Sequence, residues 1–389
     1  MKKLVKLITV FMVISSILTG CSSSGDEETT ATTIKVGVNM ELSGSVASYG
    51  QAEFNGIELA VKQINAAGGV LGKQIELVTV DNTSAAAEAT SVTTRLATVD
   101  EVVAILGPAT SGAFKASLPV AEENGVAIIS PSATDSTVMI NETTDAAYAA
   151  GFRTCFVDSF QGVTMANFAS NNLSATKAVI FGDNSSDYAQ GLALSFTAQF
   201  EANGGTIVTQ ESFNSGDTDF NSVLTKIAAI DYDVIFIPGY YNEAGLIIKQ
   251  AREMGITTPI LGADGFESPD LINLAGTANI TDIYYSTHYT SVGDDAKVAA
   301  FVAAYNAEYG ENPNSFSALA YDAAMMLFDA IERAGDADTA KVITALAATE
   351  GFEGVTGTIT VDANHDAVKA IFVVGLSGDT AVSSVKVNP

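Results

Sequence analysis

The sequence has no tryptophan, only two cysteines and only two histidines among its 389 residues. The histidines, His288 and His365, lie far apart in the chain and match neither a zinc site nor a nucleophile–base pair. These scarcities disfavour a hydrolase, a zinc protein and a disulfide-stapled domain. We therefore expect a protein that is not an enzyme, has no catalytic residues and uses neither a metal nor a cofactor.

Basic residues are also scarce. The chain has 18 lysines and arginines against 45 aspartates and glutamates, and its formal net charge is −27 at pH 7. A surface of this sign repels the phosphates of nucleic acids and the head groups of anionic lipids. Nucleic acid is therefore not an expected partner, and we expect the chain to reach a membrane only through an anchor.

Hydrophobic runs long enough to cross a membrane are missing. The apolar stretch at residues 7–18 has 12 residues, whereas a spanning helix needs about 20. It follows a basic start and leads into Leu18-Thr19-Gly20-Cys21, which is typical of a secretory signal and resembles a bacterial lipobox. We predict a signal peptide at 1–20, a lipidated Cys21 on the outer face of the cytoplasmic membrane, and a flexible tether at 21–32. An ordinary signal peptide that happens to contain a cysteine is the alternative.

A repeated alternation of short β-rich runs and helical stretches organises the rest of the chain. Such repetition predicts an α/β fold with parallel sheets covered on both faces. The first series has expected strands at 33–40, 74–80, 102–106 and 126–130 and expected helices at 49–66, 85–98 and 111–124. The second has expected strands at 177–183, 206–213, 234–238, 260–263 and 283–288 and expected helices at 188–202, 220–230 and 243–254. Three further helices, at 295–309, 316–334 and 339–349, precede two final strands at 357–361 and 370–374.

Clusters of small hydroxyl residues follow two successive strands of the first series. Thr110-Ser111-Gly112 ends one apolar run, and Ser132-Ala133-Thr134 ends the next. Ligands of open parallel sheets bind at the carboxyl ends of the strands. Ser111 could cap the following helix and turn the amides of Gly112 and Ala113 toward a bound carboxylate. Each cluster alone is equally well explained as an ordinary cap or polar turn.

The second series places different chemistry at its strand ends. Tyr240 follows one strand, Tyr188 and Tyr49 open helices, and Asp264 lies between glycines after another strand. Each of these residues could be purely structural. Together, donors for a carboxylate on one side and a carboxylate for an ammonium on the other form the complement of an α-amino acid, with the tyrosine rings covering its side chain.

From Ile34 to Val374 the chain resembles the leucine/isoleucine/valine-binding family of extracytoplasmic solute receptors. The resemblance rests on the stretches SGSVASYGQAEFNGIELAVKQINAAGGVLGKQIELVTVDN, ILGPATSGA, ISPSATD, YYNEAGLIIKQAREMG, ILGADG and FSALAYDAAMMLFDAIERAG. It implies a type I periplasmic-binding-protein fold of two doubly wound parallel-sheet lobes joined by a three-strand hinge. The implied lobes are residues 33–153 plus 286–368 and residues 154–285 plus 369–389.

The same resemblance implies a function and a set of ligand-binding residues. The protein would be a monomeric lipoprotein that closes around an aliphatic or branched-chain amino acid and delivers it to the permease of an ABC importer. The implied ligand-binding residues are Tyr49, Ser111, Gly112, Ser132, Ala133, Thr134, Tyr188, Tyr240 and Asp264.

Two departures from the family pattern keep other ligands open. Asp264 stands where branched-chain binders often carry glutamate, and Tyr188 is followed by Ala-Gln-Gly where the family commonly has glycine. A receptor of the same fold for urea, an amide or an aromatic acid is the nearest alternative. A sensor that signals through a partner, rather than feeding a transporter, is another.

Overall fold

The computed structural model describes residues 33–290 and 295–389, which belong to one compact unit, Thr32–Pro389. The predicted signal peptide, Cys21 and tether lie outside the described residues. Within the described part of the chain, no helix is both long and apolar enough to cross a membrane.

The first lobe is built on a five-stranded sheet with the order β2-β1-β3-β4-β7, and every neighbouring pair in it is parallel. Its central strands are rich in Val, Ile and Leu and buried on both faces, as a covered parallel sheet requires. The strands are β1 (Thr33–Met40), β2 (Gln74–Asp81), β3 (Ala104–Leu106), β4 (Ala127–Ser130) and β7 (Gly151–Arg153).

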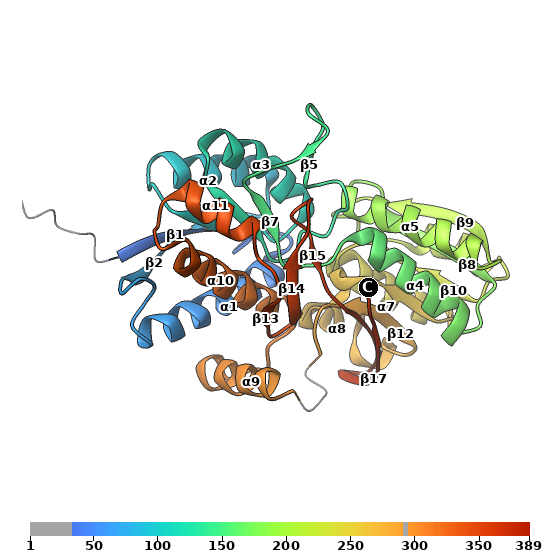
Figure 1. Cartoon of the computed structure of the whole chain (residues 1–389). Helices are drawn as coiled ribbons and strands as arrows, with labels where there is room; N and C mark the ends of the chain where they lie inside the picture. Colours follow the sequence, from blue (N-terminus) through green and yellow to red (C-terminus); the bar gives the residue numbers. More distant parts are fainter. Residues whose placement is uncertain (1–32, 291–294) are drawn as a thin grey trace, which may run out of the picture. The chain divides into compact units, whose positions relative to one another are not determined.

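Helices from two distant parts of the chain cover this sheet (Figure 1). The early ones are α1 (Ala47–Ala66), α2 (Ala86–Thr98) and α3 (Ser111–Asn124), and the late ones are α10 (Ser315–Ala334) and α11 (Thr339–Ala347). The helix α9 (Ala296–Tyr309) packs on α1 instead of on the sheet. The helix α10 packs along α1 so closely that a Cβ at Gly56 would lie 2.1 Å from the Ser317 carbonyl oxygen. Only glycine fits at this contact.

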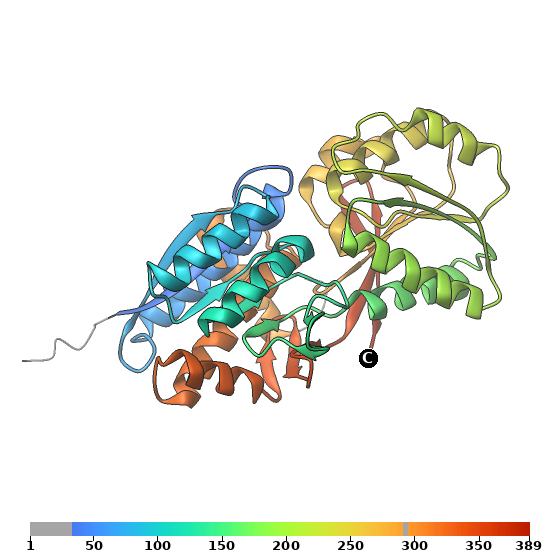
Figure 2. The same cartoon turned by 90° about the horizontal axis from the view of Figure 1, so that it is seen from above.

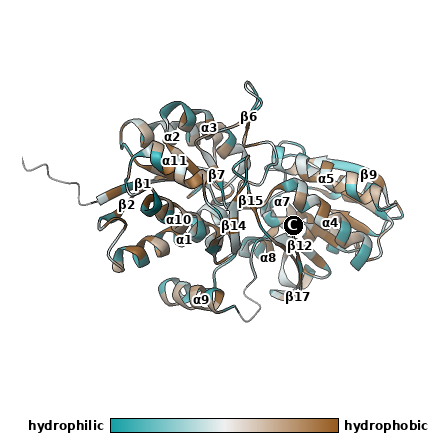
Figure 3. Ribbon diagram, viewed as in Figure 1, coloured by the Kyte–Doolittle hydropathy of each residue, from teal (hydrophilic) through white to brown (hydrophobic). Residues whose placement is uncertain are grey.

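The second lobe is built on a seven-stranded sheet with the order β17-β16-β12-β11-β10-β8-β9. Its strands are β8 (Lys177–Asp183), β9 (Thr206–Phe213), β10 (Val234–Phe236), β11 (Ile260–Gly262), β12 (Ile283–Thr287), β16 (Ile371–Ser377) and β17 (Thr380–Val387). The first five are parallel, whereas β16 and β17 pair antiparallel. Its helices are α4 (Asp158–Asn172), α5 (Asp187–Ala202), α6 (Asn221–Ala228), α7 (Tyr241–Glu253) and α8 (Pro269–Ala275). Figure 3 shows hydrophilic and hydrophobic stretches on these helices, as expected for elements with one buried face.

Smaller elements complete the chain. The hairpin β5 (Ile140–Asn141) and β6 (Ala146–Ala147) follows β4, and the strands β13 (Phe352–Gly354), β14 (Gly357–Val361) and β15 (Ala367–Val368) form a small sheet. Two short 3₁₀ turns, η1 (Asp264–Phe266) and η2 (Thr277–Asn279), flank α8.

The chain passes between the two sheets three times, after β7, after β12 and after β15 (Figure 2). The predicted alternation of strands and helices is therefore present in both lobes. The lobe boundaries 33–153 plus 286–368 and 154–285 plus 369–389 stay a prediction.

Several elements differ from the sequence predictions, α8 and the short strands β5, β6, β13 and β15 among them. The helix α4 was not predicted because its inward positions include polar residues such as Gln161 and Thr164, which hide the helical period. The run at 152–157 is strand-like in the sequence, but the strand β7 ends at Arg153. The chain also does not end with the two predicted strands, because β17 follows as an exposed edge strand without alternating burial.

Candidate functional site

A small cavity of about 10 Å³ lies between the lobes, and six of the nine predicted ligand-binding residues line it. These six are Tyr49, Ser111, Ser132, Tyr188, Tyr240 and Asp264, and they share the cavity with Ala109, Thr110, Gly265 and Phe316. The other three do not line it. Gly112 is exposed on α3, whereas Ala133 and Thr134 are buried behind the wall.

The loop before α3 forms one wall, and Glu41 holds it in place. The Glu41 carboxylate accepts hydrogen bonds from the backbone N–H groups of Ala109 and Thr110, both at 3.0 Å, and from the Thr110 hydroxyl at 2.8 Å. The predicted cap at Ser111 is wrong, because Thr110 occupies the N-cap position and Ser111 begins the helix. Ser111 Oγ instead accepts from the Asp135 N–H at 3.1 Å. Its own O–H is therefore left to serve as a donor toward the cavity.

Ser132 reveals an acid that the sequence analysis missed. Its Oγ lies within hydrogen-bond distance of both Glu53 Oε1 and the Ala109 carbonyl oxygen, the latter at 2.9 Å. One hydroxyl has one proton and cannot donate to both. If Ser132 donates to Ala109, Glu53 must carry a proton and donate to Ser132. Complete burial raises the pKa of Glu53 well above its usual value, and the nearby Glu41 charge adds to this rise.

Replacing Glu53 with glutamine is expected to flatten the pH dependence of stability. An acid with a raised folded-state pKa contributes stability below its unfolded pKa of about 4.3 and loses it as pH rises toward the folded value. The glutamine variant lacks that loss, which is up to about 1.4 kcal/mol per pH unit. Between about pH 5 and about pH 7, urea unfolding should show that the free energy of unfolding of the glutamine variant rises relative to that of the wild type. Parallel pH profiles would mean that Glu53 is ionised in the fold.

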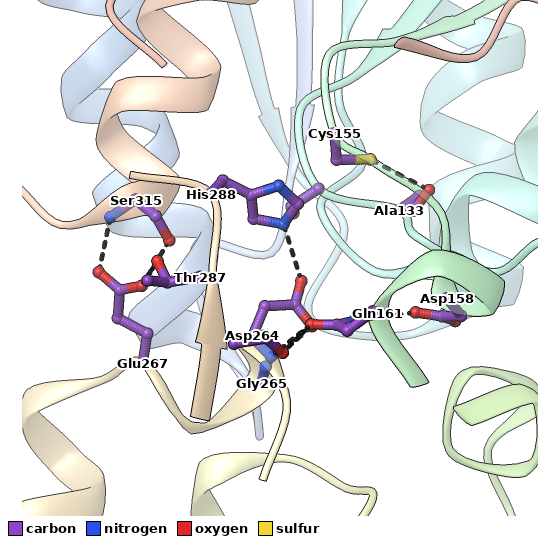
Figure 4. A network of polar contacts seen from close by, with 12 residues as sticks. Ala133, Cys155, Asp158, Gln161, Asp264, Gly265, Glu267, Thr287, His288 and Ser315 are labelled. Carbon is purple, nitrogen blue, oxygen red and sulfur yellow. Dashed lines mark hydrogen bonds and ion pairs between the residues drawn. The ribbon is translucent and has the colours of Figure 1, made fainter. Parts of the chain in front are cut away.

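Asp264 lies at the centre of a buried hydrogen-bond network in the second lobe (Figure 4). Its Oδ1 accepts from the Tyr188 hydroxyl at 2.7 Å, the Gln161 amide at 3.1 Å and the Gly265 N–H at 3.1 Å. Its Oδ2 lies 3.2 Å from His288 Nε2, so its carboxylate has four polar contacts, as many as the Gln161 amide beside it. A carboxylate offers about four lone-pair directions in total. Oδ1 is therefore saturated, and only Oδ2 can accept a further donor.

A second aspartate adjoins this network from the start of α4. Asp158 Oδ1 accepts from the Gln161 amide at 3.1 Å, so Gln161 bridges Asp158 and Asp264. Burial, and then the charge of Asp264, raise the pKa of Asp158 well above its usual value. Asp158 Oδ2 and Thr134 Oγ1 are buried, and neither has a hydrogen-bond partner of good geometry among the described residues. Two carboxyl groups therefore lie together behind this wall, and the sequence pointed only to Asp264.

Aromatic rings form the rest of the wall. The rings of Tyr49 and Phe316 stack with centroids 4.4 Å apart, and those of Tyr188 and Tyr240 stack at 5.2 Å. Tyr49 also meets Tyr240 edge to face at 5.6 Å. The four rings supply apolar faces around the polar groups, which suits an aliphatic side chain. Phe316 lies near the start of α10, and its sequence pattern is typical of the apolar helix face that packs on α1. The sequence therefore did not predict that Phe316 lines the cavity.

Hydrogen bonds between the lobes surround the cavity. The Tyr49 hydroxyl donates to the Gly265 carbonyl oxygen at 2.5 Å, and Ser48 and Ser268 share a hydrogen bond of 2.8 Å. Glu267, three residues after Asp264, accepts from the Ser315 N–H at 2.8 Å and from the Ser315 hydroxyl at 2.7 Å (Figure 4). The two lobes are therefore in contact, and the cavity walls converge.

A larger groove of about 900 Å³ opens between the same lobes. Its lining mixes exposed acidic residues such as Asp217 and Glu311 with half-buried or buried residues such as Leu246 and Tyr305. The small cavity is the better candidate for a ligand site because its polar groups are buried, oriented by other residues and partly unpaired. Its volume of about 10 Å³ holds about one water molecule, so an amino acid can enter only when the lobes move apart.

Comparison with known proteins identifies the family. A family model described as periplasmic binding protein matches residues 33–381. The chain belongs to this family. Within it, the chain is 30% identical over 336 residues to the leucine-, isoleucine-, valine-, threonine- and alanine-binding protein of Pseudomonas aeruginosa, an alignment that covers 86% of this chain and 87% of the relative. The predicted membership in the leucine/isoleucine/valine-binding group of the periplasmic binding proteins is confirmed.

Solved structures support the same assignment. The branched-chain amino acid transporter substrate-binding protein LivJ of Streptococcus pneumoniae, in complex with isoleucine, is 45% identical with a TM-score of 0.87. The alignment covers 92% of this chain and 100% of LivJ. The leucine-binding protein LivK of Thermotoga maritima is 35% identical with a TM-score of 0.86, covering 92% and 99% of the two chains. The predicted type I periplasmic-binding-protein fold is confirmed.

Proposed function

We propose that this periplasmic binding protein captures an aliphatic or branched-chain amino acid and delivers it to an ABC importer. One observation carries the proposal: Ser111 and Asp264, from opposite lobes, line one buried cavity with four aromatic rings. This arrangement offers hydroxyl donors for a carboxylate, an anionic acceptor for an ammonium and apolar faces for a side chain. The isoleucine complex of the relative LivJ supports the same class of ligand.

The proposed binding mode assigns each group of residues one part of the ligand. Ser111 donates its hydroxyl to the carboxylate, because its Oγ only accepts in its described contact. Thr134 lies behind the cavity wall beside Asp158 and supports that wall. Asp264 accepts the ammonium through Oδ2. Tyr49, Tyr188, Tyr240 and Phe316 surround the side chain. Gly112, Ser132 and Ala133 act by shaping the hydroxyl-bearing loops.

Closure follows from the distribution of these groups over two lobes. A ligand that bonds to both lobes binds the closed form more tightly than the open form and so shifts the population toward closure. The interlobe hydrogen bonds of Tyr49, Ser48 and Glu267 would form only in that state. We further propose that the protein acts as a monomeric receptor without enzymatic activity, outside the cytoplasm, and that a permease recognises its closed form.

The ligand can be identified directly. Native mass spectrometry of the purified protein, followed by calorimetry with leucine, isoleucine, valine, urea and benzoate, tests the proposal. Micromolar or tighter binding of an aliphatic amino acid is expected, with no binding of urea or benzoate, because only the amino acid carries both charges. A preference for benzoate or urea would replace the proposed ligand, and a ligand-bound protein that stimulates no transport would favour a sensor.

Replacing Cys21 with alanine is expected to release the protein into the medium. The lipid on Cys21 would be its only membrane attachment, since the surface is too acidic to bind anionic lipid. Cell fractionation and immunoblotting measure the effect. Cys155→Ala is the matched control, because Cys155 is buried and should leave the anchor intact. Continued membrane association of the Cys21 variant would disprove the anchor.

A further inference from the structure

His288 is a buried histidine beside the cavity, at the end of the strand β12, where the chain passes from one lobe to the other. Its Nε2 lies 3.2 Å from Asp264 Oδ2 (Figure 4). Its ring stacks on Phe156, with centroids 3.5 Å apart and planes inclined by 20°. The stacking and the complete burial hold the imidazole in one orientation, facing the carboxylate.

The surroundings of His288 determine its protonation. Burial lowers the pKa of His288 to about 4, and this outweighs the opposing effect of Asp264. Lys369, on the third passage between the lobes, also disfavours a charged imidazole. The ring is therefore neutral at physiological pH. A neutral imidazole has one N–H, and only a proton on Nε2 can make a hydrogen bond to the carboxylate.

The other ring nitrogen supports the same tautomer. His288 Nδ1 is buried and has no hydrogen-bond partner among the described residues. A proton there would leave a buried donor unpaired and would turn a lone pair of Nε2 toward a carboxylate oxygen. Both effects are unfavourable, so the Nε2–H form is the one that this geometry supports.

We propose that His288 is a positioning residue of the ammonium subsite. By donating Nε2–H to Asp264 Oδ2, it occupies one lone pair and orients the remaining one toward the ligand ammonium. Three donors already saturate Oδ1, so His288 sets the direction of the only oxygen still able to accept. The proposal rests on the proposed function, in which Asp264 binds the ammonium.

The tautomer can be tested without any ligand. The chain has only two histidines, so long-range ¹H–¹⁵N spectra of the imidazoles contain two sets of signals, and a His365→Gln variant assigns them. We expect His288 to be neutral and protonated on Nε2 at neutral pH. An imidazolium, or a proton on Nδ1, would overturn the proposal even if the protein binds amino acids as proposed.

The effect on recognition can be tested with two ligands that differ at one group. Isoleucine carries an ammonium where its 2-hydroxy acid analogue carries a hydroxyl. His288→Phe keeps the stacked ring but removes the donor, and should weaken isoleucine binding about tenfold while changing binding of the hydroxy acid by less than about twofold. His288→Gln restores an N–H donor and should recover most of the isoleucine affinity.

Calorimetry with both ligands and thermal unfolding of each variant separate the possible outcomes. An equal loss for both ligands, or an unchanged isoleucine affinity in the phenylalanine variant, would contradict a positioning role. If the phenylalanine variant does not fold, the glutamine variant is compared with His288→Asn, whose shorter side chain cannot reach Asp264 and should lose the preference for isoleucine. If the wild type binds no amino acid, the proposed function fails, whereas the tautomer remains testable.

Discussion

Replacing Asp264 with alanine is expected to weaken amino-acid binding by about 2–5 kcal/mol, the range for truncating one partner of a buried charge pair. Asp264 is almost fully buried, and the proposed binding mode assigns the ligand ammonium to its Oδ2. Without it, the ligand ammonium would give up its hydration water on entering a cavity lined by aromatic rings and uncharged hydroxyls. No carboxylate oxygen of Asp264 would then replace the hydrogen bonds to that water.

Two further variants sharpen this experiment. Asp264→Asn keeps the shape but removes the charge, so a similar loss would assign the effect to electrostatics rather than to a cavity. Asp231→Ala is the control, because Asp231 lies in the same lobe with a side chain that is 89% exposed. Isothermal titration calorimetry gives the affinities. Unchanged affinity in the alanine variant would remove Asp264 from the ligand site.

Replacing Arg153 with methionine is expected to lower the free energy of unfolding by about 3–5 kcal/mol, as found when one partner of a buried ion pair is removed. Arg153 is completely buried where the chain first passes between the lobes. Its Nε donates to Asp366 at 2.6 Å, and its Nη1 donates to the carbonyl oxygens of Ala133 and Asp135, both at 2.7 Å. Methionine fills much of the volume but leaves a carboxylate and two carbonyl groups without their donor.

The same substitution should disturb ligand binding, because Arg153 holds the two residues that flank Thr134. Urea unfolding measures the stability, and calorimetry measures the affinity. Arg95→Met is the matched control: its ion pair with Asp100 is at the surface, and its loss should cost at most about 1 kcal/mol. If both variants lose the same small amount of free energy of unfolding, the contacts of Arg153 do not stabilise the first passage between the lobes more than a surface ion pair would.

Much of the architecture could be predicted because neighbouring residues encode it. The alternation of apolar β-rich runs with helical periods predicted both sheets, and most expected elements match the structure within two residues. The elements that were missed lack that local signal. In α4, polar residues such as Gln161 occupy inward positions because they serve the buried network around Asp264. The edge strand β17 has no buried side to produce alternation.

Some residues of the candidate site could likewise be predicted from the local sequence, and others could not. Ser111, Ser132, Tyr188, Tyr240 and Asp264 could be predicted because each stands at a strand end or helix start, where parallel sheets bind ligands. Glu53 could not be predicted because it lies inside α1, and Asp158 could not because α4 itself was not predicted. Phe316 and His288 do stand at element ends, but an apolar ring on a helix face and a histidine without a catalytic or metal pattern gave no sign of a site.

The sequence by itself determined the order of strands and helices, the acidic surface and the residue types available at the strand ends, since these depend on composition and local periodicity. Only the tertiary structure decided which acids are buried together, which hydroxyls keep an unpaired proton and which oxygen of Asp264 can still accept one. Those properties depend on desolvation and on contacts between residues more than a hundred positions apart, such as Gln161 with Asp264, and no local pattern encodes them.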